Sequence, residues 1–277
     1  MTMRNLILAA GLALAASGAW AQDTVRLATE GAYPPYNFIN DQGQPDGFEI
    51  ELGNALCERA SLTCTWVTND WDSIIPNLVS SNYDAIMAGM SITPERQEVI
   101  AFTQNYLPPA PSAYAALSPD ADLEGGTIAV QSGTIQAAHI AESGAKPLEF
   151  ATGEESVAAV QNGEADAVFA DKDFLAPLVE AAGGELQFVS EDVSLGNGIG
   201  VGLRQSDTEL KGKLDEVITA MKADGSLNEL ITKWFGPEAQ NLRGLRRRRH
   251  RGLHPVTPDG APTAGAPVPT KEDAPRS

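Results

Sequence analysis

The stretch YDAIMAGMSITPERQ, residues 83–97, is the most informative part of the chain for its fold. YDAIMAG predicts a short buried strand, and SITPERQ predicts the start of a helix directly after it. Thr93 suits the N-cap and Pro94 the first helical position. Arg96 then falls in the first turn, where the helix dipole favours an anion over a cation. This arginine therefore needs a negative partner, either a neighbour such as Glu95 or Glu98 or a bound ligand.

The same order of strand, polar turn and helix recurs along the chain and predicts an α/β fold. Polar or aromatic residues follow the predicted strands at Glu30, Trp71, Ser91, Arg96, Thr134, Gln136 and Asp171. In open α/β sheets, ligands bind outside the carboxyl ends of the strands, near helix N-termini. Two such sheets facing each other would bring these turns to one cleft. The pattern predicts a small-ligand site.

The two ends of the chain differ from its body in composition. Arg4, an apolar run and the A-x-A sequence at residues 19–21 predict a signal peptide over residues 1–21, so we expect an exported protein. An uncleaved membrane anchor is the alternative. Residues 243–277 combine an arginine run with Pro, Ala, Gly and Thr, which predicts a disordered basic tail. It is either a dispensable extension or, as such runs attract polyanions, an RNA- or membrane-binding segment.

The body of the chain is strongly acidic. Residues 22–242 contain 34 Asp and Glu against 10 Lys and Arg. Such a surface repels nucleic acid and anionic membranes and attracts cations, although most of these charges serve only as a solvated surface. We expect no nucleic-acid partner. The body, of roughly 220 residues, is long enough for one large domain or for two lobes.

Cys57 and Cys64 are the only cysteines. An exported chain meets an oxidising environment, which favours a disulfide between them over two free thiols. Two sulfurs and three scattered histidines do not match a structural metal site, so no metal or cofactor is expected.

Seven stretches, in collinear order from residue 23 to residue 236, resemble the polar amino-acid periplasmic binding proteins (family 3) of ABC importers. They are DTVRLATEGAYPPYNF, GFEIELGNALCERA, DWDSIIPNL, YDAIMAGMSITPERQEVIAFT, VQSGTIQ, ADAVFAD and GIGVGLRQSDTEL with ADGSLNELITKWFG. The chain is most similar to the lysine/arginine/ornithine, histidine and opine receptors. In the basic amino-acid members a disulfide corresponds to the cysteine pair.

This resemblance implies an α/β fold of the two-lobed periplasmic-binding-protein type II, with two hinge strands and the ligand in the inter-lobe cleft. Lobe 1 would comprise residues 22–107 and 199–242. Lobe 2 would comprise residues 108–198, including hinges near residues 107–112 and 194–198.

The resemblance also assigns the ends of the ligand. Arg96 would bind the α-carboxylate, since a guanidinium offers two parallel donors to it. The backbone N–H groups of Ser91 and Ile135 would complete the anion pocket. Asp171 would accept the α-amino group, helped by the Ser91 hydroxyl and the Gly89 carbonyl; alternatively, Asp171 caps the next helix.

The side-chain end of the ligand would lie between Tyr33 and Trp71, which could instead be core residues, with Glu30 meeting a distal cation. Ala88 and Gly89 stand where close relatives have serines, which widens the pocket, and Gln131 replaces an apolar residue. The expected ligand-binding set is Glu30, Tyr33, Trp71, Ala88, Gly89, Ser91, Arg96, Gln131, Thr134, Ile135, Gln136 and Asp171. Arginine is the first choice of ligand, followed by ornithine, lysine or an opine, with histidine behind them.

The implied function is a monomeric, non-enzymatic periplasmic receptor that delivers a cationic amino acid to an ABC permease of the inner membrane. Two alternatives stay open. One is a cyclohexadienyl dehydratase-like enzyme on the same fold, for which Glu30 is a candidate acid. The other is a receptor that docks on a chemoreceptor or sensor kinase.

Overall fold

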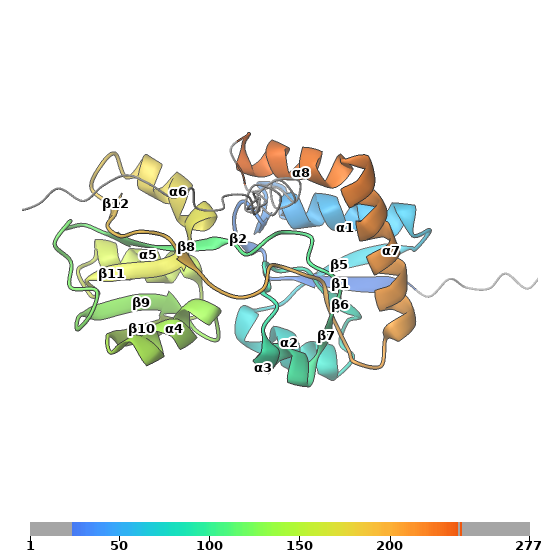
Figure 1. Ribbon diagram of the computed structural model, residues 1–277, viewed down its shortest axis with the longest axis horizontal. Helices are drawn as coiled ribbons and strands as arrows, with labels where there is room; N and C mark the ends of the chain where they lie inside the picture. The colour runs from blue at the N-terminus through green and yellow to red at the C-terminus, as the bar shows by residue number, and fades with distance from the viewer. Residues whose placement is uncertain (1–23, 238, 240–277) are drawn as a thin grey trace, which may run out of the picture. The chain divides into compact units, whose positions relative to one another are not determined.

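The structure is a computed structural model and describes residues 24–237 and 239. The predicted signal peptide, residues 1–21, and the predicted tail, residues 243–277, lie outside the described residues. Within residues 24–237, strands and helices alternate and build two mixed sheets (Figure 1), so the expected α/β class is confirmed. No helix in this part of the chain combines the length and the apolar character needed to span a membrane.

The first sheet has five strands in the order β5-β1-β6-β14-β7. Its strands are β1 (Val25–Thr29), β5 (Cys64–Thr68), β6 (Ala85–Ile86), β7 (Ala101–Phe102) and β14 (Gly202–Leu203). Its helices are α1 (Phe48–Arg59), α2 (Trp71–Val79), α3 (Pro94–Val99), α7 (Thr208–Asp224) and α8 (Ser226–Phe235). Because β1, β5 and β6 are parallel, their carboxyl ends lie at one edge, and the turns carrying Glu30, Trp71 and Ala88 start there.

Side chains on β1 alternate between the two faces of this sheet. Leu27 packs with Phe48 and Leu52 of α1, whereas its neighbour Ala28 packs with Ile74 of α2. Helices α7 and α8 lie on the α1 side (Figure 1). Both faces are therefore covered, as expected for parallel strands.

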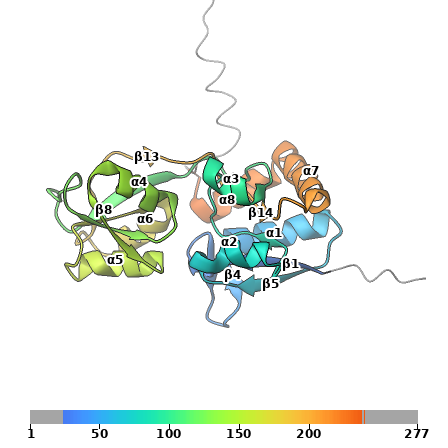
Figure 2. The ribbon, with the colours of Figure 1, turned by 90° about the horizontal axis from the view of Figure 1, so that it is seen from below.

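The second sheet has the order β10-β9-β11-β8-β12, and β13 also pairs with β8. Its strands are β8 (Pro111–Ala116), β9 (Thr127–Gln131), β10 (Lys146–Phe150), β11 (Ala167–Asp171), β12 (Gln187–Phe188) and β13 (Val193–Ser194). Its helices are α4 (Ile135–Ser143), α5 (Gly153–Gln161) and α6 (Lys172–Ala181). Phe169 packs with Ile140 of α4 and Val168 with Val157 of α5, so these helices cover opposite faces (Figure 2).

The chain crosses between the two sheets twice, after β7 and after β13. The two crossing segments run beside each other: Ile199 N donates to Leu107 O at 3.1 Å, and Tyr106 N donates to Ile199 O at 2.8 Å. Ile92 N, close to the turn of Arg96, donates to Gly198 O at 2.8 Å. The crossings are thereby tied to the turn of the predicted anion site.

A small third sheet leads from β1 into α1. It contains β2 (Ala32–Tyr33), β3 (Asn37–Ile39) and β4 (Pro45–Asp46). Cys57 and Cys64 form the expected disulfide, which links α1 to the start of β5. Since Cys64 begins β5 and Trp71 follows its end, the disulfide lies at the opposite end of that strand from the predicted site.

Candidate ligand-binding site

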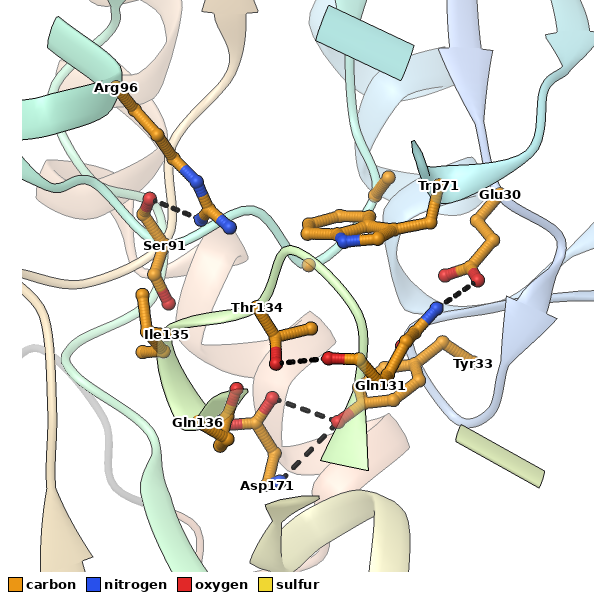
Figure 3. A pocket seen from close by; sticks show the side chains of 12 residues that line it. Glu30, Tyr33, Trp71, Ser91, Arg96, Gln131, Thr134, Ile135, Gln136 and Asp171 are labelled. Atoms are coloured by element: carbon orange, nitrogen blue, oxygen red, sulfur yellow. Dashed lines mark hydrogen bonds between the residues drawn. The ribbon is translucent and has the colours of Figure 1, made fainter. Parts of the chain in front are cut away.

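One pocket is lined by all twelve residues of the expected ligand-binding set, although they lie between position 30 and position 171 of the chain. Figure 3 shows Arg96 and Ser91 on one side, Trp71 and Glu30 on the other, and Asp171 with Gln136 below them. The side chains come from the carboxyl ends of β1, β5, β6, β9 and β11 or from the residues that follow these ends. The structure shows how these side chains are arranged around the pocket, and the contact that each would make with a ligand stays a prediction.

Arg96 points into this pocket from the first turn of α3. Thr93 caps the helix by accepting from Arg96 N at 3.2 Å. The guanidinium donates through Nη1 to Ser91 O at 2.8 Å and through Nη2 to Gly133 O at 3.1 Å. Within residues 24–237, no carboxylate lies within ion-pair distance of it, so the alternative of a salt bridge to Glu95 or Glu98 is absent there. Burial lowers the pKa of Arg96 to about 10, which leaves it charged at neutral pH.

Asp171 ends β11 and is almost fully buried. Its Oδ2 accepts from the Tyr33 hydroxyl at 3.0 Å, and its Oδ1 accepts from Gln136 Nε2 at 3.0 Å. It stands at the N-cap position of α6 but makes no side-chain capping bond to that helix. Burial raises the pKa of Asp171 to about 7. A carboxylate held in this way is stabilised by any cation that reaches it.

Glu30 lies at the other end of the pocket. Its Oε1 accepts from Gln131 Nε2 at 2.6 Å, and the same Gln131 amide donates to Ala151 O at 3.0 Å. Burial, and after it the negative charges of Glu49, Asp70 and Asp72, raise the pKa of Glu30 to about 7. No lysine or arginine of the described chain pairs with it. The ionised carboxylate of Glu30 is therefore unfavourable until a positive group approaches it.

The two aromatic residues differ in their contacts. The Tyr33 ring stacks on Phe174 with centroids 4.3 Å apart, so one of its faces is covered by the protein. The Trp71 ring lies beneath Arg96, whose Cζ is 5.3 Å from the ring centroid (Figure 3). Both residues line the pocket, and stacking on a ligand side chain stays a prediction for each.

The end of β9 and the turn after it supply three consecutive residues that form hydrogen bonds with the first sheet's side. Gln131 bonds Glu30, Ser132 Oγ donates to Asp72 Oδ1 at 3.1 Å, and Gly133 O accepts from Arg96. Thr134 then caps α4, accepting from Ala137 N and donating to Gln131 O. Ile135 begins the helix, and Gln136 bonds both Asp171 and Ser112. The two sheets are thus bridged directly around the pocket.

Sequence reasoning missed the support beneath the pocket. Glu49 is fully buried and accepts hydrogen bonds from Gly89 N, Asn37 Nδ2 and the Tyr106 hydroxyl. In sequence it is one of two acids in the first turn of α1, where any glutamate suits the helix dipole. Nothing in the local pattern distinguishes it from the exposed acids, because its partners lie far away in the chain.

The charged lining defines what the pocket can bind. It holds one fixed cation, Arg96, and two carboxyl groups, Asp171 and Glu30. When both carboxyls are ionised, the lining carries one net negative charge. A molecule with one anionic and two cationic groups would match all three. No cluster of three or more potential metal-ligating side chains occurs in the described residues.

The sequence matches the family model described as bacterial extracellular solute-binding proteins, family 3, over residues 25–237. Among curated proteins, the octopine-binding periplasmic protein of Rhizobium meliloti is 33% identical over 288 residues, covering 85% of this chain and 98% of the relative. The ABC transporter arginine-binding protein 1 of Escherichia coli (strain K12) is 31% identical, covering 84% of this chain and 99% of the relative. Both are named as binding proteins rather than enzymes.

A solved structure is considerably more similar. It is a periplasmic His/Glu/Gln/Arg/opine family-binding protein from Silicibacter pomeroyi in complex with lysine. The two chains share 67% sequence identity, with a TM-score of 0.77, over 78% of this chain and 99% of the other. This similarity and the two sheets described above confirm the expected two-lobed periplasmic-binding-protein fold.

Proposed function

Because the chain belongs to the bacterial extracellular solute-binding proteins of family 3, we propose that it is a periplasmic receptor for a cationic amino acid. It would deliver this ligand to an ABC permease, without catalysing a reaction. The family-level role, an amino-acid-binding receptor of an ABC transporter, is shared by its relatives. The ligand, the permease and a monomeric state are parts of the proposal.

The charge of the pocket lining carries the proposal. Arg96 suits an α-carboxylate, and Asp171 suits an α-ammonium group. A zwitterion alone would satisfy these two and leave the carboxyl of Glu30 buried without a cation. A ligand with a further positive group at the end of its side chain satisfies all three. Lysine, ornithine and arginine have this pattern, whereas neutral amino acids do not.

Two observations rank the ligands differently. Trp71, with the small residues Ala88 and Gly89, favours the bulky guanidinium of arginine, and curated relatives near 30% identity are named for arginine and octopine. The 67% identical relative, however, was solved with lysine. The proposal therefore includes both ligands, and competition between them decides their order.

Binding would couple to closure of the two lobes, with bending near residues 107–112 and 194–198. Arg96 belongs to the first sheet's side and Asp171 to the second's, so one zwitterion contacts both only when they are close together. A ligand that binds one form better shifts the population toward that form. The proposal includes export to the periplasm, which the predicted signal peptide at residues 1–21 and the periplasmic names of relatives support.

A binding screen tests the proposal. The melting temperature of the mature protein is measured with each common amino acid, with ornithine and with octopine. Isothermal titration calorimetry then follows for the ligands that raise it. We expect lysine, arginine and ornithine to bind one-to-one with micromolar or tighter affinity, about 8 kcal/mol or more. Binding of only neutral or acidic amino acids would contradict the proposed ligand class. Turnover of prephenate or arogenate would instead support the dehydratase alternative.

Docking on a permease is tested separately. The liganded receptor is added to a reconstituted candidate ABC transporter, and ATP hydrolysis is measured. We expect stimulation by the receptor with lysine or arginine. Absence of stimulation, together with tight binding to a chemoreceptor domain, would favour the sensory alternative.

A further inference from the structure

Glu49 is a buried carboxylate that the proposed function does not use. Its side chain has no solvent exposure, and no lysine or arginine of the described chain forms an ion pair with it. Burying an acid without a cation costs free energy, which hydrogen bonds from suitable donors offset. The identity of those donors shows what Glu49 connects.

Three donors converge on its two oxygens. Gly89 N lies 2.7 Å from Oε1 and 2.9 Å from Oε2, Asn37 Nδ2 lies 2.8 Å from Oε2, and the Tyr106 hydroxyl bonds Oε1. A flip of the Asn37 amide would break two hydrogen bonds, because its Nδ2 donates to Glu49 and its Oδ1 accepts from Gly31 N at 2.7 Å. The surroundings are therefore built for a group that accepts on both oxygens.

Each donor belongs to a segment that matters for the pocket. Asn37 holds Gly31, which directly follows Glu30, the residue proposed to meet the distal cation. Gly89 lines the pocket itself near Ser91. Tyr106 stands at the start of one crossing segment, where its N–H bonds Ile199 O at 2.8 Å. One carboxylate thus joins the segment at the distal-cation end, the segment at the zwitterion end and a crossing segment.

The backbone of Glu49 is fixed as well. Glu49 N donates to Tyr36 O at 2.9 Å and Phe48 N donates to Pro35 O at 3.0 Å, so the start of α1 is tied to the turn between β2 and β3. Gly47, just before the helix, has φ 123°, and a Cβ there would lie 2.6 Å from Tyr36 O. Both the backbone and the carboxylate of Glu49 are therefore held in place.

We propose that Glu49 is a positioning residue that sets the distance between the distal-cation end and the zwitterion end of the pocket. It does not touch the ligand. The proposal rests on the proposed function, since it assumes a ligand with charged groups at both ends. Its consequence is selectivity for the length of the ligand side chain, of which lysine and ornithine, differing by one methylene, are suitable probes.

Two substitutions at this position separate charge from length. Glu49→Gln replaces one acceptor by an NH₂ group that faces other donors, and we expect the dissociation constants of lysine and ornithine to rise about tenfold or more. Glu49→Asp keeps the carboxylate but shortens it by one methylene. We expect it to change the lysine-to-ornithine affinity ratio by about threefold or more, since one methylene of misfit is measurable in a closed pocket.

Glu51→Gln is the matched control. Glu51 lies in the same turn of α1, but its Oε2 accepts from Lys233 Nζ and Trp234 Nε1, away from the pocket. We expect this variant to keep both affinities and their ratio. Tyr106→Phe, which keeps the buried ring and removes a single donor, serves if Glu49→Gln does not fold. We expect it to weaken lysine binding about threefold or more.

Isothermal titration and the melting temperature without ligand are measured for every variant. A lower melting temperature with an unchanged lysine-to-ornithine ratio in Glu49→Asp would overturn the proposal, because it would show a structural role only. Unchanged lysine binding in Tyr106→Phe and Glu49→Gln would do the same. If the parent protein binds no cationic amino acid, the proposed function fails instead, and the two failures are distinguishable.

Discussion

The hydroxyl of Tyr33 donates a hydrogen bond of 3.0 Å to Oδ2 of Asp171, although 138 residues separate the two in sequence. Tyr33 belongs to the small sheet beside β1, and Asp171 ends a strand of the second large sheet. Gln136 Nε2 holds the other carboxylate oxygen. The acid proposed to bind the ligand's amino group is therefore held at both oxygens, by Tyr33 from the first sheet's side and by Gln136 from its own side.

Tyr33→Phe removes one of these two donors and keeps the stacking on Phe174. We expect the dissociation constant of lysine to rise about tenfold, because a hydrogen bond to a charged group contributes about 1.5–3 kcal/mol. Isothermal titration at pH 7.5 measures it. An unchanged dissociation constant would mean that the Tyr33 hydroxyl does not orient the Asp171 carboxylate for ligand binding.

Arg96→Ala should abolish detectable binding of every amino acid. The α-carboxylate would lose its fixed cation, and truncating one partner of a buried charge pair costs about 2–5 kcal/mol or more. Arg96→Lys should restore only part of the affinity, since an ammonium group cannot bind a carboxylate bidentately. Circular dichroism checks the fold. Near-parental binding by Arg96→Ala would place the carboxylate elsewhere.

Glu30→Gln should separate cationic from neutral ligands. The substitution removes the charge that would meet the distal cation and keeps the shape of the side chain. We expect lysine and arginine to bind about tenfold or more weakly, and glutamine binding to change far less. Titration of all three ligands into parent and variant measures this. Equal losses for the three would show that Glu30 does not read the side-chain charge.

Affinity for lysine should rise between pH 6 and pH 8. Burial raises the pKa of both Glu30 and Asp171 to about 7, so protons compete with the cationic ligand below that pH. We expect a gain of about tenfold or more over this range. Titrations at several pH values measure it, and Glu30→Gln should show the shallower dependence because one of the two groups is gone.

The same two carboxyls should act oppositely on stability without ligand. Their pKa values are higher in the folded chain than in the unfolded one, where they are about 4, so the folded chain binds more protons between pH 4 and pH 7. Their contribution to the free energy of unfolding therefore falls as pH rises through this range. Urea unfolding of parent and Glu30→Gln at each pH isolates the contribution of Glu30. A difference independent of pH would contradict the assignment.

Removing the disulfide should cost stability but not binding. Cys57 and Cys64 are seven positions apart and close a short loop, for which chain entropy predicts about 2–3 kcal/mol. The bond lies at the opposite end of β5 from Trp71. We expect the double serine variant to unfold at lower urea concentration and to bind lysine as tightly as the parent at 25 °C. Weaker binding would couple this region to the pocket.

The sequence contained much of the fold in its local patterns. The strand predicted at YDAIMAG and the capped helix predicted after it both occur. Seven of the twelve candidate pocket residues were found because they follow or end a predicted strand, where the sheet edge brings such turns together. The other five, Tyr33, Ala88, Gly89, Gln131 and Ile135, came from the resemblance to the periplasmic binding proteins. The Glu30–Gln131 and Tyr33–Asp171 hydrogen bonds were beyond sequence reasoning, since they depend on how the two sheets meet.

Several elements were missed for identifiable reasons. Helix α5 begins with a capping box, Thr152 and Glu155, which was a usable signal. Helix α6 contains Pro177, which usually argues against a helix interior. Strand β8, Pro111–Ala116, is buried along nearly its whole length and follows a proline-rich stretch, so it lacks the alternation that marks a half-exposed strand.

A crystal structure of the mature protein grown with lysine or arginine tests the central claim most directly. The account predicts one molecule in the pocket, with its α-carboxylate on the Arg96 guanidinium, its α-ammonium group on Asp171 and its distal cation within hydrogen-bond distance of Glu30. A ligand bound elsewhere, or one whose distal cation points to solvent away from Glu30, would contradict it.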